Sequence, residues 1–428
     1  MKVLIIGGNL AATRWSHSGL IRQLCRGLAG RGHDVTLACM SADDPAWFAP
    51  ARLISMAPYD HSASDWPAGF ARWTRVVVAA ARADVVISTS RLAWGDVWLP
   101  LGPSASAWIQ QVTGALGPVG LGKWVYKHTG VLAARAVEAR RPWPRGIGSA
   151  RPSRVAVFGT EAAANAREAL AAHRLDTRVV ALPFVASCEP PDDLARERDR
   201  IELRRAAGAR ATDTFGLVSS VELVGEALGP MLQAIAQVNA RLGRTGREGK
   251  FILGVLARDA FHAHDAAVRA GAADAVRVLG TTDRIVSVLG ACDVAIVPPA
   301  AIPDAFVTGS AGRFAADALR LARPVLAADG APGAELLASL PGLGPAGAVV
   351  RHDGVEPASA PWERAIARAM EPQWQDRAMV AAAAAGAPER IGSAQFFDAL
   401  EDAIDTAIGE RNRSASRRAE RLLVTRRR

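Results

Sequence analysis

The stretch Thr308–Gly330, TGSAGRFAADALRLARPVLAADG, decides the fold. It opens with glycines and small hydroxyl residues, continues as an apolar pattern with helical spacing, and ends in PVLA, a run typical of a buried strand. A loop of small residues that leads into a helix leaves backbone N–H groups available to bind an anion. The stretch therefore predicts a turn, a helix and a parallel strand, with an anion site at the start of the helix.

The same alternation of strand and helix patterns covers the chain and predicts an α/β protein. Helices are expected at about 18–32, 161–173, 228–242, 262–270 and 284–289, with helices only after Ala358. Two series of strands of similar size predict two Rossmann-like domains within 428 residues. The first series is KVLIIG, DVTLAC, DVVIST, RVAVFG and RVVALP, and the second is TFGLVSS, KFILGVL, AVRVLG, DVAIVPP, PVLAAD and GAVVRH. The polar stretch Glu189–Asp199, EPPDDLARERD, is the predicted linker.

The positive charge is concentrated at the C-terminus. The tail from Gly409, GERNRSASRRAERLLVTRRR, has eight Arg and two Glu and so carries most of the net charge of +9. The nearly neutral remainder argues against a nucleic-acid partner, which requires a basic face. From Arg411 the tail has few apolar residues and is expected to be disordered. Two interpretations stay open: a solvated terminus without a partner, or a segment attracted to an anionic membrane.

Compartment and metal content are also constrained by the sequence. The four cysteines are far apart and lack ligand spacing, which favours reduced, buried thiols over disulfides or a zinc site: Cys25, Cys39, Cys188 and Cys292. No apolar run approaches the roughly 20 residues that span a bilayer. The start, MKVLIIGGNL, is too short for a signal peptide. We expect a cytoplasmic protein, and a tail that binds lipid would place it at the inner face of the membrane.

Five segments together resemble the family 4-type glycosyltransferases of the two-domain GT-B fold, over about residues 1 to 400. The first begins at Lys2 and contains GLAGRGHDVTL. The other four are RVAVFGTEAAANARE from Arg154, RIELRRAAGARATDTFGLVSSV from Arg200, VRVLGTTDRIVSVLGACDVAIVPP from Val276 and GRFAADALRLARPVLAADG from Gly312. The resemblance implies an interdomain cleft and no metal. It also implies five parts: an acceptor domain (1–188), a linker (189–199), a nucleotide-sugar domain (200–392), a crossover helix (393–410) that returns to the first domain, and the disordered basic tail (411–428).

The resemblance assigns a donor site. The family carries two acidic residues eight positions apart, and aligning ARPVLA places Asp317 at the second, ribose-contacting position and Gly309 at the first, so one carboxylate is missing. Arg313, in the first turn, is expected to bind the diphosphate. Alternatively, Arg313 is an exposed helix residue paired with Asp317 at i+4. The implied donor-binding residues are Gly280, Thr281, Gly309, Ser310, Gly312 and Asp317.

The chain departs from the family at its cations and at its acceptor side. The family's Arg and Lys after the first donor-domain strand are replaced by Ser219 or Ser220 and by Val224. Another arginine would then have to offset the charge on the leaving diphosphate, the candidates being Arg258, Arg284 and Arg313. His17 and Ser18, in the first βα loop, are expected to face the cleft. The stretch WIQQVTGAL offers Gln110, Gln111 and Thr113 where the family has a histidine, and His128 is a further candidate. The implied catalytic residues are His17, Arg258 and Arg313, and the implied acceptor-side residues are Ser18 and Thr113.

These features predict a metal-independent, retaining, hexosyltransferase-like enzyme. It would move a sugar from a nucleotide-diphosphate sugar, its donor substrate, to a sugar or lipid-linked acceptor, with no other cofactor. The missing cations and carboxylate leave a non-catalytic GT-B binding protein as the alternative, and an epimerase on the same fold also stays open. A nicotinamide enzyme is disfavoured, because IIGGNLAAT lacks the GxGxxG spacing and Cys39 and Met40 stand where a ribose-binding acid would follow the second strand.

Overall fold

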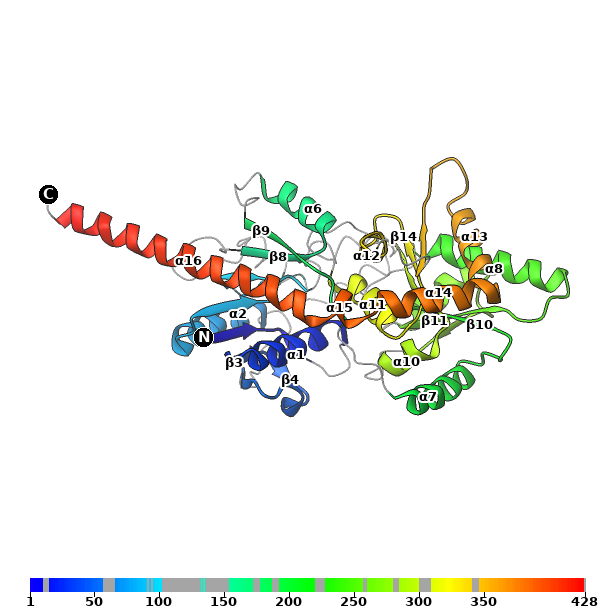
Figure 1. The fold of residues 1–428 in the computed structure, drawn as a ribbon, viewed down its shortest axis with the longest axis horizontal. Helices are drawn as coiled ribbons and strands as arrows, with labels where there is room; N and C mark the ends of the chain where they lie inside the picture. Colours follow the sequence, from blue (N-terminus) through cyan, green and yellow to red (C-terminus); the bar gives the residue numbers. More distant parts are fainter. Residues whose placement is uncertain are drawn as a thin grey trace.

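Two parallel β-sheets, each covered by helices, lie side by side and are joined by a long C-terminal helix (Figure 1). The computed structural model describes residues 1–10, 15–56, 66–90, 92–93, 95–101, 132, 134, 154–171, 178–186, 192–219, 228–256, 260–279, 285–299, 309–340 and 346–426. The two-domain α/β class predicted from the sequence is confirmed.

The first sheet has the strand order β5-β3-β1-β6-β7-β8-β9 and is parallel throughout. Its strands are β1 (Lys2–Ile6), β3 (Asp34–Cys39), β5 (Arg52–Ser55), β6 (Val85–Ser88), β7 (Val97–Trp98), β8 (Arg154–Phe158) and β9 (Val179–Leu182). Around it lie α1 (Trp15–Gly30), α2 (Trp66–Ala81), α6 (Thr160–Ala171), the short 3-10 helix η1 (Pro45–Phe48) and the strand pair β2 (Asn9–Leu10) and β4 (Ser41–Ala42). Central strands such as β1 and β6 are continuous apolar runs because helices bury them on both faces.

The second sheet has the order β12-β11-β10-β13-β14-β15 and is also parallel. Its strands are β10 (Thr214–Ser219), β11 (Phe251–Leu256), β12 (Val276–Val278), β13 (Val294–Val297), β14 (Val325–Ala328) and β15 (Gly347–Val350). The helices are α7 (Asp193–Ala206), α8 (Gly229–Arg244), α9 (Ala260–Arg269), α10 (Ile285–Ala291), α11 (Gly309–Arg320), α12 (Pro332–Ala338), α13 (Ala360–Ala369), α14 (Pro372–Ala385) and α15 (Pro388–Ile391). These elements match the predicted alternation.

Both sheets reverse their strand order at one point. The reversal lies between β1 and β6 in the first sheet and between β10 and β13 in the second. In open parallel sheets, ligands bind at the carboxyl ends of the strands beside such a switch point. The topology thus marks the ends of β1 and β6, and of β10 and β13, as the places where a ligand site is expected.

Two chain segments cross between the domains, and they run next to each other. The N–H of Ala186, beyond β9, donates to the carbonyl of Ile391, at the end of α15, over 3.1 Å. The Gln23 amide on α1 donates to the carbonyl of Ala186 over 2.9 Å and holds the crossing against the first domain. The chain therefore passes between the domains at one place, which we call the double crossing (Ala186 and Ile391).

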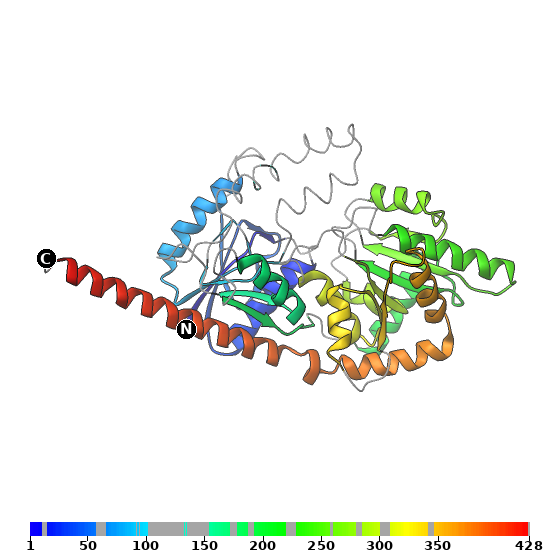
Figure 2. The same cartoon turned by 90° about the horizontal axis from the view of Figure 1, so that it is seen from above.

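Helix α16 (Ser393–Arg426) returns to the first domain, as the resemblance implied, and Figure 2 shows it running along that domain. Phe396 stacks on Phe158 of β8 with ring centroids 5.8 Å apart. The Phe397 ring lies where a Cβ on Gly27 would be 1.9 Å from it, so only glycine fits on α1 at this contact. Arg31 forms ion pairs of 2.7 Å with both Asp398 and Glu401.

The structure corrects the predicted linker at 189–199. Asp193 begins α7, and this helix belongs to the second domain. Asp199 accepts a hydrogen bond from Ser287, and the Arg204 guanidinium donates to Asp293 over 2.6 Å. The second half of the predicted linker is therefore the start of a helix packed on the second domain, with Asp199 buried as a hydrogen-bonding partner of α10.

The predicted disordered tail at 411–428 is also wrong, because α16 continues through Arg426. The Arg411 guanidinium donates to the Asp96 carboxylate over 3.3 Å and to the carbonyl of Asp84, and Arg154 pairs with Glu410 over 3.0 Å. Beyond this anchor the side chains of residues 412–417 are all exposed. A helix that is already nucleated continues readily through Ala and Arg, and Figure 1 shows it projecting past the first domain.

Candidate functional site

The helix predicted from the opening stretch is α11, and it begins at Gly309 beyond the end of β13. It therefore starts at the switch point of the second sheet, between β10 and β13. The first backbone N–H groups of a helix have no partner within the helix, and the helix dipole is positive at this end. Gly309 and Ser310 lie in that first turn, and their part in anion binding stays a prediction.

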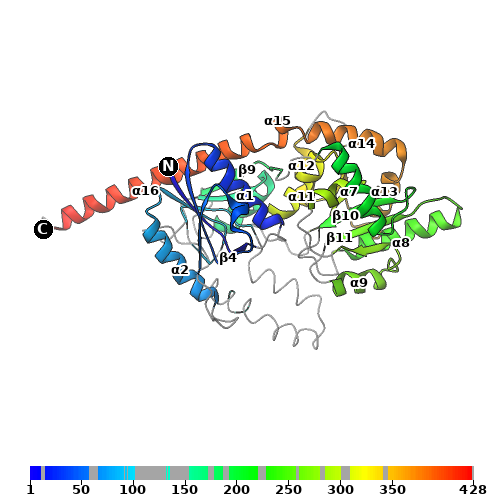
Figure 3. The same ribbon diagram turned by 90° about the horizontal axis from the view of Figure 1, so that it is seen from below.

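Helix α11 is buried on every side. Residues 312–319 are all buried, because the helix packs against α12, α14 and β13 of its own domain and against α1 and β8 of the first. Figure 3 shows α11 next to α1 at the domain boundary. A Cβ added to Gly312 would be 2.2 Å from the Phe184 ring, which follows β9. The start of α11 is thus held directly against the first domain.

Arg313 and Asp317 lie one turn apart on α11, and both have no exposed surface. The alternative that Arg313 is an exposed helix residue is wrong, because its side chain is fully buried. Both side chains interact with neighbouring residues. Burial of two opposite charges is expensive unless they are paired and hydrogen-bonded, so their presence in an otherwise apolar helix points to a specific use.

In the first domain, His17 and Ser18 lie on a helix and not in the first βα loop, where they were expected. Helix α1 begins at Trp15, so His17 and Ser18 belong to its first turn. The Ser18 side chain has no exposed surface. An acceptor could contact it only after the surrounding residues move apart, and its role remains a prediction.

Sequence reasoning missed the residues after β6, which share the switch point of the first sheet with the end of β1. Thr89 donates from its hydroxyl to the carbonyl of Ile6 over 3.0 Å, and the Ser88 hydroxyl donates to the carbonyl of Ser90 over 2.9 Å. Ser90 in turn accepts from the N–H of Leu92 over 3.2 Å. The strand order, which pairs β6 with β1, is the signal that identifies this hydroxyl cluster.

A contact between the domains was also missed. Glu335 of α12 accepts hydrogen bonds from the first turn of α6, from the N–H and hydroxyl of Thr160 and from the N–H of Glu161. Thr160 and Glu335 are 175 positions apart, so no local pattern points to their contact.

Several predicted residues lie outside the described residues. These are Gln110, Gln111, Thr113, His128, Ser220, Val224, Arg258, Gly280, Thr281 and Arg284. The backbones of His17, Gly309, Ser310 and Ser219 are described, and their roles stay predictions.

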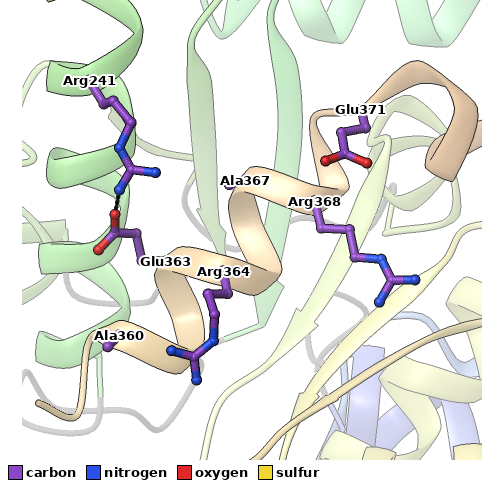
Figure 4. Close-up of a pocket in the computed structure, with 7 residues that line it drawn as sticks. All are labelled: Arg241, Ala360, Glu363, Arg364, Ala367, Arg368 and Glu371. Carbon is purple, nitrogen blue, oxygen red and sulfur yellow. Dashed lines mark ion pairs between the residues drawn. The ribbon is translucent and has the colours of Figure 1, made fainter. Parts of the chain in front are cut away.

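One surface cavity of about 420 Å³ lies elsewhere, between α8 and α13 (Figure 4). Arg241 and Glu363 form an ion pair across it, and Arg364 binds Glu356 through both terminal nitrogens. None of the predicted donor-site residues lines it. Because two of its three arginines are already paired, the cavity offers little charge for a phosphate ligand.

The described cysteines are buried, as predicted. Burial raises the pKa of Cys25 and of Cys292 to about 12 and that of Cys39 to about 11. Such thiols are neither nucleophiles nor metal ligands at neutral pH. Within the described residues, no group of three or more His, Cys, Asp or Glu side chains is placed to hold a metal ion. No helix in the described part of the chain is long and apolar enough to cross a membrane.

Comparison with solved structures identifies the architecture. WaaG, a glycosyltransferase involved in lipopolysaccharide biosynthesis, matches with a TM-score of 0.62 over 93% of this chain and 98% of its own, at 16% identity. The chain has the GT-B fold. Two further GT-B structures agree. Anabaena HepE with UDP and glucose matches at TM-score 0.60 and 15% identity over 95% of this chain and all of its own. The catalytic domain of Arabidopsis thaliana starch synthase IV, bound to ADP and acarbose, matches with a TM-score of 0.57 at 11% identity. The match covers 95% of this chain and 99% of its own. No protein-family model and no curated protein sequence matches the chain.

The GT-B fold gives the switch points a common interpretation. Helix α11, which follows β13 at the switch point of the second sheet, contacts α1 and β8 of the first domain. The predicted donor-site residues on α11 therefore lie where the topology expects a ligand, and where the two domains meet.

Proposed function

We propose that this protein is a glycosyltransferase that moves a sugar from a nucleotide-diphosphate sugar to an acceptor, without a metal and with retention. The observation that carries the proposal is the position of α11. Its N-terminus lies at the switch point of a GT-B second domain, and its first turns hold a buried arginine and a buried aspartate. Solved neighbours with this fold bind UDP and glucose or ADP.

The first turn of α11 supplies the chemistry for a diphosphate. Its N–H groups and the positive end of its dipole attract an anion, and Arg313 at the start of the second turn adds a cation. Asp317, one turn further, has the carboxylate that two ribose hydroxyls would require as acceptor. In a retaining reaction the protein chiefly positions the donor and stabilises the leaving diphosphate.

Access to this site requires movement. Arg313 and Asp317 are fully buried, and their helix α11 contacts both its own domain and the first domain. A donor would reach them when the domains separate and would be enclosed as they close. Closure excludes water, which strengthens each charged contact with the diphosphate. The hydroxyl cluster after β6 (Ser88, Thr89, Ser90) and the first turn of α1 lie at the first-domain switch point and would face the acceptor.

The exposed part of α16 suits a lipid-linked acceptor. Arg413 and Arg417 lie one turn apart in a segment where every side chain is exposed from 412 to 417, and each arginine near an anionic surface contributes about 1 kcal/mol. Deletion of residues 412–428 should remove salt-sensitive sedimentation with anionic liposomes and leave thermal stability unchanged. Equal sedimentation of both forms would refute the membrane contact. Arg411 must be retained, since it anchors the helix to Asp96.

Thermal unfolding across a panel of UDP-, GDP-, ADP- and TDP-sugars tests the proposal. A specific donor at about 100 times its Kd should stabilise the protein by about 2.7 kcal/mol. Transfer of labelled sugar, or slow hydrolysis of the stabilising donor, would then establish the reaction. Failure of every nucleotide sugar to stabilise the protein would refute the donor site.

A non-catalytic GT-B binding protein is the second candidate. Ser219 ends β10, where the resemblance expects an arginine, and Gly309 replaces a carboxylate at the start of α11. A protein that binds a nucleotide sugar tightly and neither transfers nor hydrolyses it would fit this candidate. Transfer activity would exclude it.

A further inference from the structure

Glu335 connects the two domains by capping a helix of the other one. Its Oε1 accepts from the Thr160 hydroxyl over 2.8 Å and from the N–H of Glu161 over 3.1 Å, and it also accepts from the N–H of Thr160. Glu335 belongs to α12 in the second domain, whereas Thr160 begins α6 in the first. Figures 1 and 2 show these two helices next to each other across the domain boundary.

The first turn of α6 has no cap of its own. Gly159 precedes it with a φ of +88°, and a glycine has no side chain that could accept from the free N–H groups. A Cβ at this position would lie 2.3 Å from Glu335 Oε2, so the close approach of the carboxylate also requires glycine. The same interaction therefore caps α6 and joins the domains. A carboxylate at this end of a helix is favoured by the dipole as well as by the hydrogen bonds.

A second contact holds the same two domains at a different point. Gly312, at the start of α11, packs under Phe184, close to the double crossing at Ala186 and Ile391. At the double crossing the continuous main chain links the two domains, so they cannot come apart completely there. The Glu335 contact is made by one side chain and can break while both domains remain folded.

We propose that Glu335 is a positioning residue that holds the domains in the arrangement where α11 is enclosed, and that its release from Thr160 opens the donor site. The predicted effect on donor binding rests on the proposed function. The predicted effect on the arrangement of the domains rests on the structure alone. When the contact is lost, the enclosed arrangement becomes less populated. The apparent affinity for a donor that requires enclosure then falls by the same factor.

The kinetic consequence is a split between KM and kcat. For a contact of this kind, removal of the Glu335 carboxylate should raise the donor KM about fivefold to tenfold, whereas saturating donor restores closure and leaves kcat within about twofold. Glu335→Gln keeps an oxygen acceptor without the charge and should lie between the wild type and Glu335→Ala. Thr160→Val removes the hydroxyl and retains the N–H groups, so it should have a smaller effect, and it should add nothing to Glu335→Ala.

Hydrogen–deuterium exchange without any substrate tests the mechanical part independently of the reaction. Glu335→Ala should speed exchange in the first turn of α6 and also in α11, which the first domain no longer covers. Glu168→Gln removes an exposed carboxylate from the same helix α6, and it should change neither segment.

The outcomes are distinct. Faster exchange in both α6 and α11 supports the proposal, even if no nucleotide sugar is ever turned over. Faster exchange in α6 alone would show that Glu335 is only a local cap and would overturn the positioning role. Unchanged exchange in both segments would overturn the contact itself. Should Glu335→Ala fail to fold, Glu335→Gln and Thr160→Val report on the same two segments.

Discussion

Replacement of Gly312 by alanine tests whether the start of α11 is pressed against the first domain. A Cβ here would lie 2.2 Å and 2.6 Å from two atoms of the Phe184 ring, far inside van der Waals contact. Phe184 has little room to give way, because its ring stacks on Phe158 with centroids 6.5 Å apart, and Phe158 in turn stacks on Phe396. The helix or the aromatic stack must therefore move.

The two opposing effects differ in size. Overpacking of a close contact typically costs about 1–3 kcal/mol. Alanine in a helix interior is more favourable than glycine by about 1 kcal/mol. We therefore expect Gly312→Ala to be neutral or to lower the free energy of unfolding by up to about 2 kcal/mol, since the clash exceeds the gain in helix propensity.

A matched glycine supplies the control. Gly243 lies in α8, is exposed, and a Cβ there would meet no atom within 4 Å. Gly243→Ala should therefore stabilise the protein by up to about 1 kcal/mol. Urea unfolding of both variants gives the comparison directly. In a Phe184→Ala background the cost of Gly312→Ala should vanish. If Gly312→Ala stabilised the wild type as much as Gly243→Ala does, the contact between α11 and Phe184 would be refuted.

Three further predictions concern the donor site, the crossover helix and the thiols. Asp317→Ala should weaken nucleotide binding by about 1.5–3 kcal/mol, measured by calorimetry, and unchanged affinity in a folded variant would move the ribose contact elsewhere. Burial raises the pKa of Asp96, so the folded protein keeps this proton to a higher pH than the unfolded chain does. The free energy of unfolding therefore falls as the pH rises from the unfolded to the folded pKa of Asp96. Arg411→Ala removes the cation that lowers the pKa of Asp96 and should cost about 1–3 kcal/mol at pH 7, with a smaller loss as the pH falls and the carboxyl takes up its proton; a loss that does not change with pH would exclude the ion pair. At pH 8 a thiol with a pKa near 11 is about one thousandth thiolate, so a thiol reagent should label at most one cysteine of the native protein and all four after unfolding.

The fold could be predicted from the sequence because the buried strands of a parallel sheet are short apolar runs, which are a local signal. Strands such as Val294–Val297 and Val325–Ala328 are buried on both faces and flanked by Asp, Gly or Pro. It failed at the polar segments. The first residues of α7 resembled a linker because a partner such as Ser287 for Asp199 is 88 positions away. The distal part of α16 resembled a disordered tail because its anchor, Arg411 on Asp96, is 315 positions away.

Some features of the candidate site also have a local signal in the sequence, and others do not. The start of α11 at Gly309 could be predicted, since small residues before an apolar helical pattern are a local signal. The burial of Arg313 and Asp317 could not, because it depends on how α11 packs against distant elements of both domains. Glu335 offered no signal either, since a glutamate in a short helix is ordinary until the uncapped helix opposite it is known.

The burial of α11 also links donor binding to domain movement. Two charged side chains of this helix have no exposed surface while the first domain covers it, and each remains favourable there only through the partners it has. When the domains separate, water would reach the surroundings of these two side chains. A bound diphosphate would then replace that water with a charged ligand. The donor and the first domain therefore act on the same two residues. For this reason a change at the boundary such as Glu335→Ala should alter donor affinity, although the Glu335 side chain is not expected to contact the donor.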